Sequence, residues 1–242
     1  MSLSKNHIKL ITSLQQKKYR QKHKLFIAEG VKVVNELLNS AFDVEQLFAT
    51  SDFVNSPRRA NDVEVSEAEL KKISQLKTPN KVLGLFKIPE KLPTKNTGLI
   101  VALDAINDPG NLGTIIRLCD WFGVQKLVCS TTTVDSYNQK VVQASMGSLA
   151  RVEIVHTDLT HYLKEAELPI FIADMEGENI YKVALPKEAI LVMGNEANGI
   201  SEEIRKMVDT KISIPRFGDI QETESLNVAT ATAILLSEFK RS

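Results

Sequence analysis

Three stretches of the chain combine glycine, asparagine and charged residues where a buried strand gives way to a loop or helix. The first is LDAINDPGNLGTIIR, in which a strand ends at Asp104 and a helix begins near Asn111, the residue expected to cap it. Arg117 lies off the apolar stripe of that helix, four residues after a glycine, so a phosphate or ribose could approach it. The alternative is a surface ion pair between Arg117 and Asp120 or Asp104.

The second stretch is LVMGNEANGI, residues 191–200, which passes from a buried strand directly into a glycine-rich loop. Gly194 and Gly199 permit positive φ or close backbone approach, and such a loop can present several N–H groups to a ligand. Glu196 precedes the next helix, so it is not needed as a cap and is available to a ligand or to an arginine. An ordinary surface turn is the alternative.

The third stretch is ISIPRFGDIQETESLNVATATAILLSEF, residues 212–239. A short strand ends at Pro215, a polar loop follows, and a long helix is expected to begin at Ser225. A terminal helix packed on a sheet would account for Ser225 and the alanines. It explains Asn227 poorly, because this amide lies among small and apolar residues where it can reach backbone groups or a ligand.

The elements that must position these residues are unbroken apolar runs, which indicate strands buried on both faces. The runs span residues 98–104, 124–130, 168–174, 189–194 and 210–215. Helical patterns separate most of them, so we expect an α/β fold, a mostly parallel sheet with helices on both faces. Ligands bind at the carboxyl ends of such strands. Neither GxGxxG nor GxxxxGK[ST] occurs in the chain, which disfavours a nicotinamide enzyme or an ATPase.

The residues before this region form a smaller α/β pattern. Helices are expected at residues 4–18, 31–39 and 66–74, and strands at 25–29, 44–50 and 82–88. PEKLPTKNTG follows, with two prolines and a closing glycine, and is the strongest linker signal in the chain. We therefore predict a first domain at residues 1–90, a linker at 91–98 and a second domain at 99–242.

Charge is distributed unevenly along the chain, although the formal net charge is zero. Residues 1–25 contain seven basic residues and no acidic one, which suits phosphate binding, although a solvated basic helix is the alternative. The candidate phosphate-binding residues are Lys17, Lys18, Arg20, Lys22 and Lys24. The start has no signal-peptide core and no apolar run reaches membrane-spanning length, so we expect a cytoplasmic protein without a membrane partner. Two cysteines and four scattered histidines lack ligand spacing, and no metal is expected.

Taken in order, the three stretches resemble the motifs of the SpoU (TrmH) family, S-adenosylmethionine-dependent RNA ribose 2′-O-methyltransferases of the SPOUT superfamily. The resemblance covers roughly residues 98–242. The stretch KKYRQKHKLFIAEGVKVVNELL also resembles the substrate-binding domain of many members, which is similar to small RNA-binding ribosomal proteins. The resemblance implies a C-terminal trefoil knot, a homodimer and an RNA substrate, with ribosomal RNA favoured over transfer RNA.

The resemblance also implies residue roles. Arg117 would hold the RNA phosphate or activate the ribose hydroxyl, supported by Asn111, and the other polar site residues would be Glu196, Ser225 and Asn227. S-adenosylmethionine would be bound largely by backbone, at the positions matching Gly194, Ile214, Leu226 and Asn227. The loop RFGDIQETE is longer than the usual family segment, which puts local cofactor contacts in doubt.

Methyl transfer to a ribose oxygen is an in-line displacement, so alignment of the two bound reactants should be the largest catalytic contribution. A secondary hydroxyl is a poor nucleophile at neutral pH, and its proton must be removed. Arginine is normally too basic to accept that proton, so we favour Arg117 as a phosphate ligand while another group or water acts as the base. A non-catalytic RNA-binding module is the competing hypothesis.

Overall fold

The computed structural model describes residues 3–53, 60–90, 96–195, 197–208, 210–218 and 225–241. The chain forms two compact units. The first comprises Met1–Lys91 together with Asp135–Ala150, and the second comprises Leu92–Val134 together with Arg151–Ser242. The sequence prediction placed residues 135–150 in the catalytic domain, whereas their contacts place them in the first unit. Residues 91–95 of the predicted linker lie outside the described residues.

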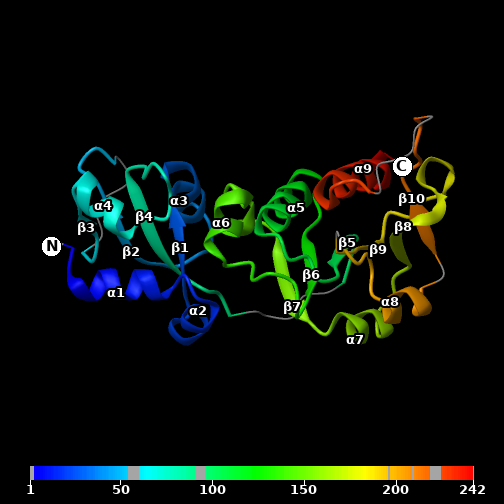
Figure 1. Ribbon diagram of the computed structural model, residues 1–242, viewed down its shortest axis with the longest axis horizontal. Helices are drawn as coiled ribbons and strands as arrows, with labels where there is room; N and C mark the ends of the chain where they lie inside the picture. Colours follow the sequence, from blue (N-terminus) through cyan, green and yellow to red (C-terminus); the bar gives the residue numbers. More distant parts are fainter. Residues whose placement is uncertain are drawn as a thin grey trace. The chain divides into compact units, whose positions relative to one another are not determined.

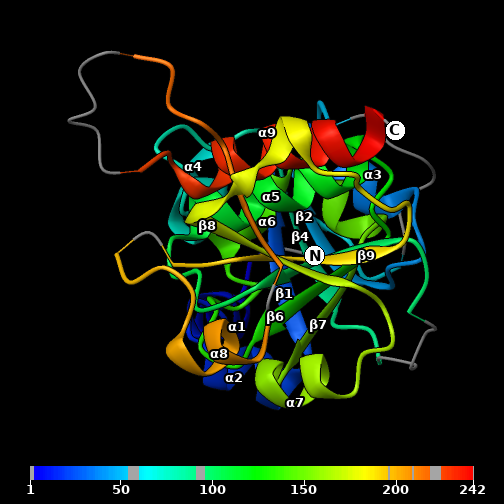
Figure 2. The ribbon, with the colours of Figure 1, turned by 90° about the vertical axis from the view of Figure 1, so that its right-hand side faces the viewer.

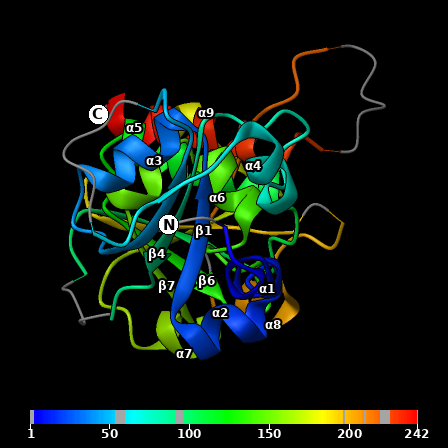
Figure 3. The same cartoon turned by 90° about the vertical axis from the view of Figure 1, so that its left-hand side faces the viewer.

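The first unit contains a four-stranded sheet in the order β1-β4-β2-β3, of which Figure 3 labels the neighbouring strands β1 and β4. Its strands are β1 (Leu25–Glu29), β2 (Val44–Ala49), β3 (Val63–Glu64) and β4 (Val82–Lys87). Its helices are α1 (Lys5–Ser13), α2 (Lys17–His23), α3 (Val31–Leu38), α4 (Glu67–Ile73), α6 (Gln139–Ser145) and the 3-10 turn η1 (Ser148–Ala150). Strand β4 is antiparallel to both β1 and β2. The single helix predicted at residues 4–18 is instead two helices, because the chain turns after Leu14.

Local sequence accounts for these elements. Ser4 and Ser66 each begin a helix with a capping box, closed by His7 and Glu69 respectively. Strand β1 is buried along its whole length. Its residues Leu25 and Ile27 join Ile11, Phe48 and other apolar side chains in a core between the sheet and helices α1 and α4. Burial of such side chains stabilises the unit by about 1.5 to 3 kcal/mol each.

The second unit contains a six-stranded sheet in the order β10-β8-β9-β5-β6-β7, and every neighbouring pair is parallel (Figure 1). Its strands are β5 (Leu99–Leu103), β6 (Lys126–Ser130), β7 (Glu153–Thr157), β8 (Ile170–Asn179), β9 (Ala189–Met193) and β10 (Lys211–Ser213). Its helices are α5 (Pro109–Trp121), α7 (Leu159–Lys164), α8 (Glu202–Met207), α9 (Val228–Arg241) and the 3-10 turn η2 (Ile180–Lys182). Strand β7 was not among the predicted strands, because only one of its five residues is fully buried.

Helices cover both faces of this sheet: α5 and α9 lie on one face, and α7 and α8 on the other (Figure 2). Strands β5, β6 and β9 are buried at every position, as their unbroken apolar sequences predicted. The predicted α/β fold with a mostly parallel sheet is confirmed. Within the described residues, no helix is long and apolar enough to cross a membrane.

Candidate functional site

The site lies at the carboxyl ends of the central strands β5 and β9. These strands run parallel, with Leu103 paired to Met193, so the residues that follow them leave the same edge of the sheet. The Asp104 amide donates to the Met193 carbonyl at 2.9 Å, which continues the pairing one residue further. The loop after β5 and the loop after β9 therefore start side by side.

The loop after β5 is stabilised by residues far away in the sequence. The Asp104 carboxylate is 8% exposed and accepts a hydrogen bond from the Ser201 amide at 2.8 Å. Ala105 adopts a left-handed conformation with φ of 57°, and its carbonyl accepts from the Asn195 side-chain amide at 2.7 Å. Asp104 and Asn195 thus join the loops after β5 and β9. Neither was identified from sequence as a site residue, although a carboxylate directly after a buried strand was an available signal for Asp104.

The loop after β9 is closed by its own backbone. Asn195 and Gly199 exchange two backbone hydrogen bonds of 2.9 and 2.8 Å. The Asn195 side-chain oxygen also accepts from the amides of Ala197 and Asn198 at 2.8 and 3.2 Å. Gly199 has φ of +66°, and a Cβ on Gly194 would lie 2.5 Å from the Ile200 nitrogen. Both glycines are therefore needed for this tight turn. Glu196 lies outside the described residues.

Asn227 and Asn111 meet at the start of the two helices on one face of the sheet. The Asn227 side-chain amide donates to the Asn111 side-chain oxygen at 2.9 Å. The Asn227 oxygen accepts from the amides of Ala229 and Thr230, so Asn227 caps α9. The helix begins at Val228, three residues later than predicted.

The expected cap of α5 was wrong. The helix begins at Pro109, and the Asp108 carboxylate accepts from the Asn111 amide at 2.8 Å, so Asp108 is the N-cap. The sequence reading missed this because proline suits the first helical position, which moves the cap one residue before it. The Asn111 side chain does not cap its own helix and contacts Asn227 instead.

Arg117 is exposed on α5, two turns after Asn111. Both alternative partners are occupied: Asp120 accepts from Arg151, and Asp104 accepts from the Ser201 amide. Among the described residues, no hydrogen bond or ion pair engages the Arg117 guanidinium. Within the described residues, no hydrogen bond or ion pair joins Arg117 to the loops after β5 and β9, so its role as a phosphate ligand stays a prediction.

The remaining predicted cofactor residues lie on either side of a gap in the described chain. Ile214 is half-buried after β10, whereas Ser225 and Leu226 are exposed before α9. Residues 219–224 of the long loop lie outside the described residues. The structure therefore joins Asn111 to Asn227 and the Gly194 loop to the Ala105 turn. Within the described residues, no hydrogen bond joins Ile214, Ser225 and Leu226 to one another.

An ion pair fixes the helix that follows the Gly194 loop. Arg205 of α8 donates to the Asp174 carboxylate in the middle of β8. The pKa of Asp174 lies below its usual value. Burial alone would raise this pKa, but the hydrogen bonds from the Glu176 amide and from Arg205 have the larger combined effect. Among the described residues, no group of three or more His, Cys, Asp or Glu side chains is arranged to hold a metal ion.

In the first unit, helix α2 carries the predicted RNA-binding residues. Lys17, Lys18, Lys22 and Lys24 are exposed. The Lys18 ammonium lies 4.8 Å from the centre of the Tyr19 ring. Arg20 differs from the prediction, because it is 3% exposed and its guanidinium is directed into the protein. A buried guanidinium cannot contact a phosphate at the surface, so the exposed candidate set is the four lysines.

The fold and the three joined segments define a known class of protein. The model of the SpoU rRNA Methylase family matches residues 98–237, and the chain belongs to this family. The model of an MRM3-like substrate binding domain matches residues 5–84. The sequence-based recognition of this family is therefore confirmed.

Particular relatives resemble the chain over nearly its whole length. The 23S rRNA (guanosine(2553)-2′-O)-methyltransferase RlmP of Bacillus subtilis is 31% identical, with 92% of this chain and 91% of the relative covered. A solved RNA methyltransferase of the TrmH family from Porphyromonas gingivalis is 38% identical with a TM-score of 0.89, covering 100% and 99% of the two chains. The AdoMet-bound rRNA methyltransferase of Sinorhizobium meliloti is 28% identical with a TM-score of 0.86, covering 100% and 96%.

Proposed function

We propose that the protein is an S-adenosylmethionine-dependent RNA methyltransferase that transfers a methyl group to a ribose 2′-hydroxyl, with ribosomal RNA as its substrate. The observation that carries this proposal is the contact of Asn111 with Asn227, beside the linked loops after β5 and β9. Three motifs distant in the chain thereby gather at one edge of the sheet. The relatives from Bacillus subtilis and Sinorhizobium meliloti, which are named as rRNA methyltransferases, support the same reaction.

The Gly194 loop would bind the adenosine group of the cofactor. A Cβ on Gly194 would enter the backbone of Gly199 and Ile200, so the loop is closed tightly around glycine. Gly194, Ile214, Leu226 and Asn227 would hold S-adenosylmethionine, with backbone groups of the loop as polar contacts and the two aliphatic side chains against the base. When bound, the cofactor supplies an electrophilic methyl group on sulfur.

The other site residues would act on the RNA. Arg117 is an exposed planar donor suited to a phosphate, and it would hold the RNA backbone beside the cofactor. Asn111, fixed by Asn227, would orient the ribose, while Glu196 and Ser225 would supply further polar contacts. The proton of the 2′-hydroxyl passes to another group or to water, because arginine is too basic to accept it.

The two domains predicted from the sequence would have different roles. Residues 1–90 would form an RNA-binding domain that presents Lys17, Lys18, Lys22 and Lys24, and residues 99–242 would form the catalytic domain. Exposed lysines attract the phosphate backbone without reading its sequence. The named substrates of the relatives support ribosomal RNA and a cytoplasmic location. Transfer RNA is the alternative substrate.

We also infer a homodimer and a C-terminal trefoil knot, both implied by the family resemblance. The exposed large hydrophobic residues among those described all belong to the second unit, which supports assembly through that unit. They are Trp121, Met175, Tyr181, Phe217 and Leu226. Sedimentation equilibrium of the purified protein tests the dimer, and a concentration-independent monomer would refute it.

Methyl transfer from radiolabelled S-adenosylmethionine tests the function. The substrates are ribosomal RNA and transfer RNA, each purified from a strain of the source organism that lacks the gene. We expect incorporation into ribosomal RNA at a 2′-hydroxyl, which protects the adjacent phosphodiester bond from alkaline hydrolysis. Incorporation into transfer RNA alone would establish the alternative substrate. RNA binding without incorporation would establish a non-catalytic RNA-binding module.

A further inference from the structure

Ala105 has a strained backbone at the start of the loop after β5. Its φ of 57° lies in the left-handed region, which alanine rarely adopts because its Cβ crowds the following carbonyl oxygen. Two other residues that share this conformation, Lys24 and Met146, each end a helix, where it is common. Ala105 instead lies between β5, which ends at Leu103, and α5, which begins at Pro109. Strain of this kind persists only where the surrounding structure holds it.

Side chains that follow other strands hold both backbone polar groups of Ala105. Its amide donates to the Ser130 hydroxyl at the end of β6 at 2.9 Å, and its carbonyl accepts from the Asn195 side-chain amide after β9 at 2.7 Å. Ser130 is 7% exposed, and its hydroxyl lies 3.0 Å from the hydroxyls of Thr132 and Thr133. The strained turn is therefore held by residues that lie 25 and 90 positions away in sequence.

Asn195 uses the two ends of its side-chain amide for different loops. Its oxygen accepts from the amides of Ala197 and Asn198 within the loop after β9, whereas its nitrogen donates to the Ala105 carbonyl. Two N–H donors face the oxygen and a carbonyl faces the nitrogen, so these contacts determine the orientation of the amide. The backbone of Asn195 is fixed by two hydrogen bonds with Gly199. One side chain thus closes the loop after β9 and holds the turn after β5.

The Ala105 turn sets the direction of the chain that leads to Asn111. Ile106 follows the turn, its side chain is completely buried, and its carbonyl accepts from the Val134 amide at 2.9 Å. Helix α5 begins shortly afterwards and carries Asn111 in its first turn, where Asn111 accepts from Asn227. Because the intervening segment is short, a rotation of the Ala105 backbone would displace Asn111 relative to the loop after β9.

We propose that Asn195 is a positioning residue for methyl transfer: by holding the strained Ala105 turn, its side-chain nitrogen keeps Asn111 aligned with the cofactor loop. The inference rests on the proposed function, in which Asn111 orients the ribose and the loop after β9 binds S-adenosylmethionine. Alignment of two bound reactants affects the rate more than the affinity, and a misplacement of about 1 Å can lower the rate about 100-fold.

The test removes the donor of this side chain and keeps its acceptor. Asn195→Asp has nearly the same shape, and its carboxylate still accepts from the two loop amides, but it repels the Ala105 carbonyl instead of donating to it. Methyl transfer is measured against increasing concentrations of ribosomal RNA from the strain that lacks the gene, and S-adenosylmethionine affinity is measured by calorimetry. We expect kcat to fall about 10-fold to 100-fold, with the KM for RNA and the cofactor affinity each within about threefold.

A rescue experiment tests whether Asn195 acts through Ala105. Asn195→Ser retains a hydroxyl that can accept from the amide two residues later, but it lacks the nitrogen that donates to the Ala105 carbonyl. This variant should also have a lowered kcat. Adding Ala105→Gly to it should recover most of the lost kcat, because glycine adopts the left-handed conformation without strain and the turn no longer needs the contact.

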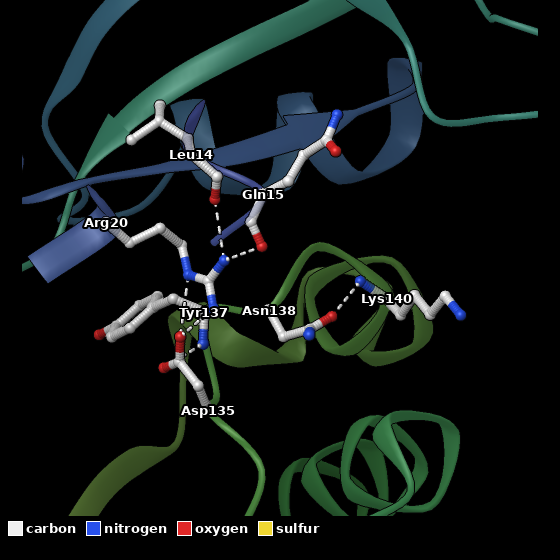
Figure 4. Close-up of polar contacts among 7 residues, drawn as sticks. All are labelled: Leu14, Gln15, Arg20, Asp135, Tyr137, Asn138 and Lys140. Atoms are coloured by element: carbon white, nitrogen blue, oxygen red, sulfur yellow. Dashed lines mark hydrogen bonds and ion pairs between the residues drawn. The ribbon is translucent and has the colours of Figure 1, made fainter. Parts of the chain in front are cut away.

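Asn138→Asp is the matched control. The Asn138 side-chain oxygen also accepts from the amide two residues later, that of Lys140, at 2.9 Å, and Asn138 caps helix α6 of the first unit (Figure 4). No described residue accepts a hydrogen bond from its side-chain nitrogen. Aspartate caps a helix about as well as asparagine does, so kcat, the KM for RNA and the cofactor affinity should all be unchanged.

A side chain that only closes the loop after β9 predicts a different result. Asn195→Asp would then keep its kcat, and Ala105→Gly would recover nothing in the Asn195→Ser protein. Either outcome would overturn the positioning role and leave the proposed function standing. If Asn195→Asp does not fold, judged by its thermal transition, Asn195→Ser and its rescue decide the question. Absence of transfer by the unchanged protein would overturn the proposed function and this inference together.

Discussion

Gly194 offers the sharpest test of the cofactor loop, because the structure leaves no space for a side chain there. In a Gly194→Ala variant, the new methyl group would lie 2.5 Å from the Ile200 nitrogen and 2.6 Å from the Gly199 oxygen. Ordinary contacts begin at 3.4 Å, and both neighbouring atoms belong to the backbone. The closest atom, the Gly199 carbonyl carbon, would lie 2.4 Å away, so the loop must open by about 1.0 Å, since no flexible side chain can yield instead.

The energetic effect follows from the hydrogen bonds that such an opening breaks. Asn195 and Gly199 exchange two backbone bonds, and the Ser201 amide donates to Asp104. Each contributes about 0.5 to 1.5 kcal/mol, so the free energy of unfolding should fall by roughly 2 to 4 kcal/mol. If about 2 kcal/mol of this loss also weakens cofactor binding, the affinity for S-adenosylmethionine falls roughly 30-fold.

Gly98→Ala is the matched control. Gly98, unlike Gly194, has positive φ, +69°, and a Cβ there meets no atom within 4 Å. This variant should lose only the roughly 1 to 2 kcal/mol of a left-handed alanine and keep full cofactor affinity. Urea unfolding and calorimetric titration with S-adenosylmethionine measure both quantities. Normal cofactor affinity in Gly194→Ala would refute the assignment of this loop to the cofactor.

The remaining predictions concern Arg117 as a ligand of the RNA phosphate, Asn227 as the cap of helix α9, and the buried carboxyl group of Glu29. Arg117→Ala should abolish methyl transfer while cofactor affinity, measured by calorimetry, stays within about threefold; lost cofactor binding would contradict the assigned role. Asn227→Ala removes the cap of α9 and the contact with Asn111, so urea unfolding should show a loss of roughly 1 to 2 kcal/mol, whereas unchanged stability would argue against the cap. Burial raises the pKa of Glu29, so the folded protein binds this proton more tightly than the unfolded chain does. The free energy of unfolding of the unchanged protein, relative to that of Glu29→Gln, should therefore decline as the pH rises from the usual glutamate pKa through the raised pKa of Glu29. Urea unfolding across this range measures that difference, and an increase with pH would contradict the reasoning.

Sequence alone determined the features that depend on local pattern. The apolar runs predicted β5, β6 and β9, because strands covered on both faces need mostly apolar side chains. Glycines and asparagines at the strand ends predicted where the site would lie, and the order of the three motifs indicated the family. These signals are contained within short windows of sequence, so no tertiary information was needed to detect them.

Only the tertiary structure decided which polar groups pair with one another. Asp104 reaches Ser201 across 97 positions, Asn111 reaches Asn227 across 116, and Arg20 reaches Asp135 across 115. No local pattern distinguishes a basic residue directed at solvent from one that a distant carboxylate draws into the interior. Arg20 was therefore grouped with its neighbouring lysines, and residues 135–150 with the catalytic domain, because burial depends on the whole fold and not on the residues nearby in sequence.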